Sequence, residues 1–217
     1  MRTKCAARWS VGAFLFTLIV LPEVAFAYRP FDGTDAAVTE PGEVEIEFQP
    51  AGVLSSNGQR TLVAPATVLN FGLVKNWEAV FEGRVETPLD TPGPTSLTDA
   101  GAFLKYVLRP GVLQDQAGPS IATEFGALLP DTIGNSRFGA SVAAIISQRG
   151  DWGTAHLNIA GALTRDQHPD LFTGIILEGP HKWVVRPVAE FFYEEEFGQA
   201  HTFSALIAAT VTPEIYQ

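Results

Sequence analysis

The chain has 217 residues, of which 46% are hydrophobic, and a formal net charge of −10 at pH 7. This acidity excludes a general affinity for nucleic acid, whose phosphates would repel the protein, so no nucleic-acid partner is expected. The only cysteine is Cys5, which excludes an internal disulfide and a cysteine-based metal site.

The first 27 residues have the organisation of a secretory signal peptide. An apolar run at 11–21 precedes Ala25-Phe26-Ala27, a cleavage site of the A-x-A type, and the basic residues before the run are Arg2, Lys4 and Arg8. The apolar run is shorter than the roughly 20 residues that a membrane-spanning helix needs. We therefore predict export with cleavage after Ala27 rather than retention by an uncleaved anchor.

Residues 28–42 follow the predicted leader and are expected on the periplasmic side. Their proline and aspartate content sets them apart from the alternating pattern that begins at Glu43. Two arrangements remain open for this segment. It either folds as a short plug into the mouth of the domain that follows or forms an untethered tail.

From residue 43 the chain alternates between polar and apolar residues. Glu43, Glu45 and Glu47 alternate with Val44, Ile46 and Phe48, so an extended strand would place carboxylates on one face and apolar side chains on the other. About ten such runs, separated by turn-forming residues, cover 43–54, 60–74, 77–87, 98–109, 118–129, 137–149, 152–164, 170–179, 182–195 and 200–212. No run has the 3.6-residue period of an amphipathic helix, and we predict an all-β, antiparallel, up-and-down fold over residues 43–217.

The two faces of each run differ consistently in polarity. In 77–87 the apolar parity contains Trp77, Ala79, Phe81, Gly83 and Val85, and the opposite parity contains Glu78, Glu82, Arg84 and Glu86. A soluble barrel or sandwich would bury the apolar face. A transmembrane barrel would turn it outward to lipid and enclose the charges in a hydrated lumen.

Strand and loop lengths favour the transmembrane barrel. Runs of this length match the roughly 9–11 residues of a tilted membrane-spanning strand, whereas strands of globular proteins centre on about five or six. The connections VKN, RGD and GPHK would be short periplasmic turns, and TPLDTPGPTS, LPDTIGNS and TRDQHPD would be longer outer loops. The connection RPGVLQDQAG on the periplasmic side breaks this rule.

Three tryptophans follow the short turns. Trp77, Trp152 and Trp183 are predicted to form an aromatic belt at the periplasmic interface, although Trp152 has the parity of the inward set. The alternative is that all three are ordinary core aromatics.

The start of the predicted mature chain, RPFDGTDAAVTEPGEVEIEF, resembles the opening of the outer-membrane family named for the meta-pathway of phenol degradation. NFGLVKNWE, DAGAFLKYVL and GALLPDT resemble later parts of that family, and the similarity covers residues 29–195. The resemblance implies a β-barrel that allows the passage or binding of a small, hydrophobic compound, with an aromatic compound as one option, and 12 strands in a complete member. The chain lacks the family's paired aspartates and ends in TVTPEIYQ without a terminal aromatic residue, so both a ten-stranded barrel and a C-terminal truncation remain open.

A barrel of ten to twelve strands has an interior that side chains can largely fill. We expect a narrow lumen crossed by ion pairs, and the charged residues predicted to line it are Glu45, Glu78, Glu82, Arg84, Lys105, Glu124, Arg186 and Glu190. The alternative is that these charges only hydrate and stiffen the interior.

The sequence offers no catalytic or metal-binding motif. His168, His181 and His201 lie in or beside predicted turns and His156 lies mid-strand, without a G-x-S-x-G, an HExxH or clustered His and Asp residues. We predict no enzymatic activity, no metal and no cofactor.

Our leading hypothesis is an outer-membrane barrel of a Gram-negative bacterium that transports small molecules. Its partners would be outer-membrane lipid and a small solute, and its oligomeric state stays open. The alternatives are a soluble periplasmic barrel that binds an apolar ligand and a purely structural outer-membrane protein. The membrane barrel and the soluble barrel differ in where they place Leu104, Leu157 and Phe191. These side chains point outward in a membrane barrel and converge inside a soluble one.

Overall fold

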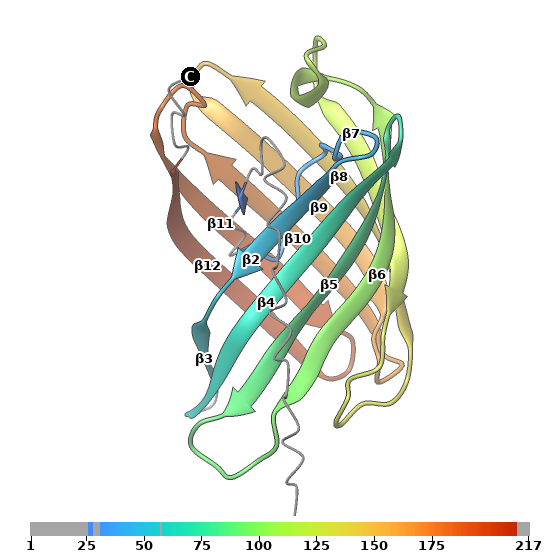
Figure 1. Ribbon diagram of the computed structural model, residues 1–217, viewed down its shortest axis with the longest axis vertical. Helices are drawn as coiled ribbons and strands as arrows, with labels where there is room; N and C mark the ends of the chain where they lie inside the picture. Colours follow the sequence, from blue (N-terminus) through green and yellow to red (C-terminus); the bar gives the residue numbers. More distant parts are fainter. Residues whose placement is uncertain (1–25, 28–30, 57, 212–217) are drawn as a thin grey trace, which may run out of the picture.

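The computed structural model describes residues 26–27, 31–56 and 58–211, and its fold is all-β (Figure 1). Apart from the two residues of β1, the predicted signal peptide lies outside the described residues. The elements are β1 (Phe26–Ala27), β2 (Val44–Gln49), β3 (Gly52–Ser56), β4 (Gln59–Val74), β5 (Trp77–Pro88), β6 (Ser96–Arg109), the 3₁₀ turn η1 (Val112–Gln114), β7 (Ser120–Leu128), β8 (Gly139–Gly150), β9 (Gly153–Leu163), β10 (Pro169–Glu178), β11 (Val185–Glu196) and β12 (Ala200–Val211).

The strands form one sheet in which each strand except β2 pairs with the next one along the chain, and β2 pairs with β4. The order is β1-β2-β4-β5-β6-β7-β8-β9-β10-β11-β12, and β3 also pairs with β4. β2 and β3 are two halves of the first predicted run, separated at Pro50, which has no N–H to donate to a ladder. The prediction of an all-β antiparallel fold with about ten strands is confirmed. Within 31–56 and 58–211, no helix is long and apolar enough to cross a membrane.

The sheet curls into an incomplete barrel (Figure 1). In the described part of the chain, β12 pairs with β11 and no ladder joins it to β2. β1, inside the predicted leader, pairs in parallel with β2 through Phe26 and Ile46. We call the concave side of this curled sheet the lumen.

The two ends of the barrel differ in their connections. At one end, which we call the short-turn end, β4 joins β5 through Asn76 at φ 69°, and β8 joins β9 just before Gly153 at φ 139°. Residues 89–95, 129–138 and 164–168 connect strands at the opposite, long-loop end. The long connection after β6 contains η1 and lies at the short-turn end, at the top of Figure 1.

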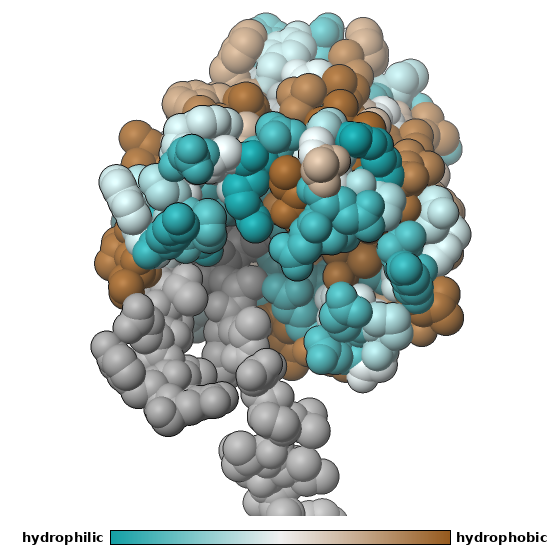
Figure 2. Space-filling model, turned by 90° about the horizontal axis from the view of Figure 1, so that it is seen from above, coloured by the Kyte–Doolittle hydropathy of each residue, from teal (hydrophilic) through white to brown (hydrophobic). Residues whose placement is uncertain are grey.

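The faces of the strands follow the predicted alternation. In β2, Glu47 is 3% exposed, whereas Val44 is 50% and Phe48 is 46% exposed. The buried residues Ala36, Ala122 and Ile145 form a small cluster, with Leu113 packed against it. Seen from the short-turn end, hydrophilic residues lie mostly over the middle of the molecule and hydrophobic residues mostly at its edge (Figure 2).

Candidate functional site

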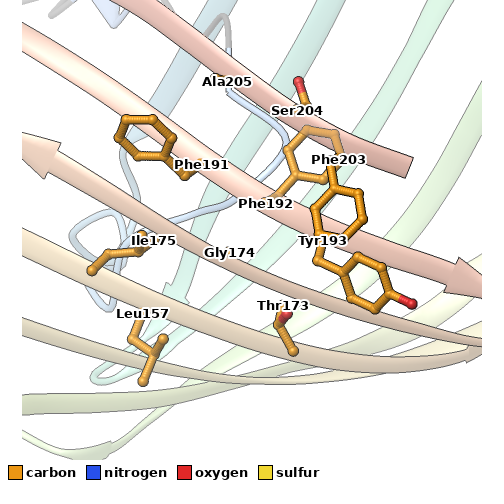
Figure 3. A pocket seen from close by; sticks show the side chains of 10 residues that line it. All are labelled: Leu157, Thr173, Gly174, Ile175, Phe191, Phe192, Tyr193, Phe203, Ser204 and Ala205. Atoms are coloured by element: carbon orange, nitrogen blue, oxygen red, sulfur yellow. The ribbon is translucent and has the colours of Figure 1, made fainter. Parts of the chain in front are cut away.

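The outer face of the sheet carries exposed apolar side chains. Leu104, Leu157 and Phe191 are 37%, 40% and 48% exposed. They do not converge inside, as the soluble-barrel alternative requires. On this face Leu157, Ile175, Phe191 and Ala205 lie directly opposite one another across β9 to β12, and they line a shallow, open apolar groove together with Tyr193 and Phe203 (Figure 3).

Aromatic residues gather at the short-turn end of this face. Trp77, the first residue of β5, stacks on Tyr106 with ring centroids 4.5 Å apart and meets Phe125 edge-on at 6.5 Å. Trp152 and Trp183 belong to connections at the same end and are 59% and 54% exposed. All three tryptophans therefore lie at the short-turn end, and Trp152 and Trp183 are not core residues. That they form a belt at a membrane interface stays a prediction.

The inner face contains a buried cation between carboxylates. Lys105 on β6 lies opposite Glu78 on β5 and Glu124 on β7. Its side chain is 3% exposed, and its Nζ is 3.8 Å from Glu78 Oε1. A buried ammonium is tolerated only where carboxylates and hydrogen-bond acceptors surround it, and this row of three predicted lumen residues provides them.

Residues 31–42, which we call the plug, run inside the barrel. The carboxylate of Glu190 accepts two hydrogen bonds from plug N–H groups, at 2.7 Å from Gly33 and 3.1 Å from Asp32. Asn158 on β9 accepts from the Thr34 N–H at 3.0 Å and donates to the Thr34 carbonyl at 2.9 Å. Of the two arrangements open from the sequence, the described residues adopt the plug.

Further contacts hold the plug closer to the short-turn end. The Ala36 N–H donates to Ser147 Oγ at 2.9 Å, and Gln114 of η1 donates to the Ala36 carbonyl at 2.9 Å. The Thr39 N–H donates to Glu78 Oε2 at 2.6 Å. The unexpectedly long connection after β6 therefore has a role, because η1 contacts the plug and Ala36 is completely buried.

Lys105 joins the wall of the barrel to the plug. Its ammonium donates to Thr34 Oγ1 at 3.1 Å and lies 3.7 Å from Asp35 Oδ1. The cation thus faces carboxylates of the wall and of the plug, and it favours the bound plug electrostatically.

Two glycines leave room for the plug backbone. A side chain at Gly33 would meet Asn158 and Glu190 at 3.1 Å and Ile176 at 3.2 Å. A side chain at Gly72 on β4 would collide with the backbone carbonyl of Glu40, beside the hydrogen bond from the Gly42 N–H to the Gly72 carbonyl. Gly72 is required by the close approach of backbone to wall, whereas at Gly33 the neighbouring side chains would have to shift by a few tenths of an ångström.

Ser147, His156 and Glu178 form a row under the plug. Ser147 Oγ is 2.8 Å from His156 Nδ1, and His156 Nε2 is 3.7 Å from Glu178 Oε1. The Ser147 hydroxyl also binds the Ala36 N–H and is completely buried. These contacts satisfy buried polar groups that anchor the plug. The absence of enzymatic activity stays a prediction.

The remaining predicted lumen residues have other partners. Arg84 forms ion pairs with Glu86 at 2.7 Å and Asp99 at 2.5 Å, and Arg186 pairs with Glu178 at 3.3 Å. Glu45 is half-buried opposite Asn70. Glu82 has the inward parity of β5 and is exposed.

The structure therefore brings together three of the eight candidates, Glu78, Lys105 and Glu124, and binds a fourth, Glu190, to the plug. The predicted lumen residues do not include Ser147, Asn158 or Gln114, although Asn158 shares the parity of His156 in β9.

Asp32 lies near the start of the plug, where its N–H binds the Glu190 carboxylate. It keeps access to water in the lumen, but the surrounding barrel raises the pKa of its carboxyl above the ordinary value; Arg84 opposes this rise and Asp99 adds to it. Over 31–56 and 58–211, no three His, Asp or Glu side chains are arranged to hold a metal ion.

The fold and the site define a class of protein: an incomplete antiparallel β-barrel with an apolar exterior and a polar interior that an N-terminal plug occupies. Comparisons with protein-family models, with curated proteins and with solved structures find no match to this chain. The resemblance to the phenol meta-pathway family therefore stays a prediction.

Proposed function

We propose that the protein is an integral outer-membrane β-barrel of a Gram-negative bacterium that facilitates the passage of small, hydrophobic molecules. The observation that carries this proposal is the inverted distribution of side chains. Lys105 and Glu190 are nearly inaccessible on the inner face, whereas Phe191, the neighbour of Glu190, is 48% exposed on the outer face. Such an arrangement is stable where lipid covers the exterior.

The aromatic residues support the same orientation. Trp77, Tyr106 and Phe125 cluster at the short-turn end of the outer face, and aromatic girdles mark the membrane interface of outer-membrane barrels. Short turns face the periplasm in such barrels. The short-turn end, with the plug, is therefore proposed to face the periplasm.

The size of the barrel limits the solute. A barrel of about ten strands leaves little space beyond its own side chains, so only small molecules would cross. The inner face also contains an aromatic pair, Phe172 and Phe192, with ring centroids 5.2 Å apart. This pair supports a hydrophobic or aromatic solute, in agreement with the resemblance to the phenol meta-pathway family.

A purely structural outer-membrane protein is the second candidate. It is favoured by the plug, because hydrogen bonds from Glu190, Asn158 and Ser147 hold residues 31–42 across the interior. A permanently bound plug would hydrate and stiffen the barrel without allowing passage.

Fractionation and permeation measurements test the two parts of the proposal. The full chain, expressed in a Gram-negative host, should be recovered with the outer membrane and require detergent for extraction. Recovery in the osmotic-shock supernatant would contradict membrane insertion. Proteoliposomes of the purified protein should then swell in small aromatic carboxylates such as benzoate faster than protein-free liposomes, whereas equal rates would favour the structural role.

A further inference from the structure

We propose that the plug, residues 31–42, is a gate: it closes the short-turn half of the lumen and must leave its bound position before a solute crosses. This inference rests on the proposed function, because a gate has a purpose only in a permeable barrel.

The plug is bound across the lumen rather than along one strand. Its partners lie on six strands and on η1: Gly72 of β4, Glu78 of β5, Lys105 of β6, Ser147 of β8, Asn158 of β9, Glu190 of β11 and Gln114. A segment attached to most of the circumference fills the space between those strands. In this position it blocks the short-turn half of the lumen.

The contacts are of a kind that water can replace. Most of them join plug backbone or hydroxyl groups to polar side chains of the wall, while the Asp35 carboxylate faces Lys105 and the Gly42 N–H binds the Gly72 carbonyl. Ala36 is the one plug residue in the buried apolar cluster. Polar groups released by the plug would meet the polar inner face or water. The plug can therefore leave without exposing a large apolar surface.

A joint at residues 41–42 allows the movement. Gly42 has φ 86°, and no atom lies within 4 Å of the position that a side chain would occupy there. Beyond it, the Gly72 N–H donates to the Glu43 carbonyl at 3.1 Å and keeps the start of β2 on the sheet. The plug is thus tethered beside a conformationally permissive residue, whose N–H donates to the Gly72 carbonyl at 2.8 Å.

Glu190 and Lys105 are the two main attachments. Glu190 binds consecutive N–H groups of Asp32 and Gly33, and Lys105 binds Thr34 and faces Asp35. Charged partners make these hydrogen bonds stronger than neutral ones. The substitution Gly33→Val weakens the first attachment from the plug side, because its side chain forces those of Glu190 and Asn158 to shift, and it replaces no residue of the barrel wall.

The test compares conductance of full-length variants in planar bilayers. Gly33→Val should release the plug and raise the mean conductance by at least about tenfold over the wild type. Gly161→Val is the matched control, since the nearest atom to its added carbon, the Asp170 carbonyl oxygen, is 4.0 Å away. A control that conducts like Gly33→Val would overturn the assignment to the plug.

A reversible cross-link provides the opposite manipulation. Ala36→Cys and Ser147→Cys, made together with Cys5→Ser, place two thiols on neighbouring residues, whose backbone nitrogen and Oγ are 2.9 Å apart in the wild type. Oxidation should abolish conductance, also in the presence of Gly33→Val, and reduction should restore it.

The outcomes separate the gate from the proposed function. If wild type and Gly33→Val conduct equally and the cross-link has no effect, the gate is overturned. The proposed role in the passage of small molecules would then still stand. Inserted protein that never conducts, in any variant, would overturn passage itself and the gate with it.

Discussion

The Glu190 carboxylate accepts a hydrogen bond of 2.7 Å from the backbone N–H of Gly33, although 157 positions separate the two residues in the sequence. Glu190 is 1% exposed, so its charge is stabilised by the plug rather than by bulk water. A carboxylate buried in this way costs free energy unless donors surround it. The plug and the wall therefore stabilise each other.

Gly72→Val should displace the plug where it passes β4, because the added side chain collides with the Glu40 carbonyl. We expect Ala36→Cys, buried in the wild-type arrangement, to react with a maleimide at least about tenfold faster when Gly72→Val is present. Cys5→Ser removes the other thiol from both proteins. Gly161→Val should leave the rate unchanged, and an equally slow reaction in Gly72→Val would contradict the close approach of plug and strand.

Lys105→Gln should destabilise the folded barrel. The substitution removes the cation that Glu78 and Asp35 face, and breaking a buried ion pair costs about 3 kcal/mol. Urea unfolding in detergent micelles, followed by tryptophan fluorescence, measures the change. Arg60→Gln breaks the exposed pair with Asp90 and should have a much smaller effect; equal effects would show that Lys105 is not a buried attachment.

Acidification should strengthen plug binding through Asp32. Its pKa in the bound plug is raised, mainly by burial and also by Asp99, with Arg84 acting in the opposite direction; Glu194 also faces it. Protonated Asp32 therefore favours the bound plug. The contribution of Asp32 protonation to plug binding is complete below the ordinary aspartate pKa. It is lost as the pH rises through the raised pKa of Asp32 in the bound plug.

Asp32→Asn removes the ionisation and is the variant that tests this sign. At neutral pH it should slow the labelling of Ala36→Cys relative to the unsubstituted plug. The ratio of the two labelling rates should approach one as the pH falls to the ordinary aspartate pKa, and a thiol-reactive disulfide reagent extends the measurement to that range. Faster labelling of Asp32→Asn at neutral pH would contradict the assignment.

Leu157→Arg should impair folding into lipid vesicles. Leu157 lies near the middle of β9 on the outer face, where an arginine at the bilayer midplane costs about 2–4 kcal/mol. Val185→Arg, at the first residue of β11, lies near the predicted interface and should cost roughly 0–1 kcal/mol. Refolding yield as a function of urea concentration gives both values, and equal tolerance of the two substitutions would argue against a lipid-covered exterior.

The strands and their faces could be predicted because period-two alternation is a local property of extended backbone. In β2, for example, Glu47 is 3% exposed and its neighbour Phe48 is 46% exposed, as the alternation predicts. Strand ends were less predictable. β6 begins at Ser96 rather than 98, and its ladder with β5 is irregular between Glu82 and Arg84, opposite Asp99 at φ 49°.

The choice between plug and tail could not be made from the sequence, because the contacts of the plug carry no periodic signal. The Thr34 and Ala36 N–H groups bind Asn158 and Ser147, which are 124 and 111 positions away, and every residue other than proline has such an N–H. One local signal was present. Gly72 interrupts an alternating strand, and a glycine in a strand interior often marks close approach of another backbone.

Site-directed spin labelling of Ile159 and Ala160 tests the central claim most directly. These neighbours lie on opposite faces of β9, and Ile159 is 47% exposed. In vesicles, with Cys5 replaced, a label at Ile159 should be relaxed by lipid-soluble oxygen and not by a water-soluble nickel chelate. A label at Ala160 should show the reverse preference. The opposite result at Ile159 would contradict a lipid-facing exterior. In that case the nickel chelate would relax the label at Ile159 strongly, and oxygen would relax it no more than it relaxes the label at Ala160.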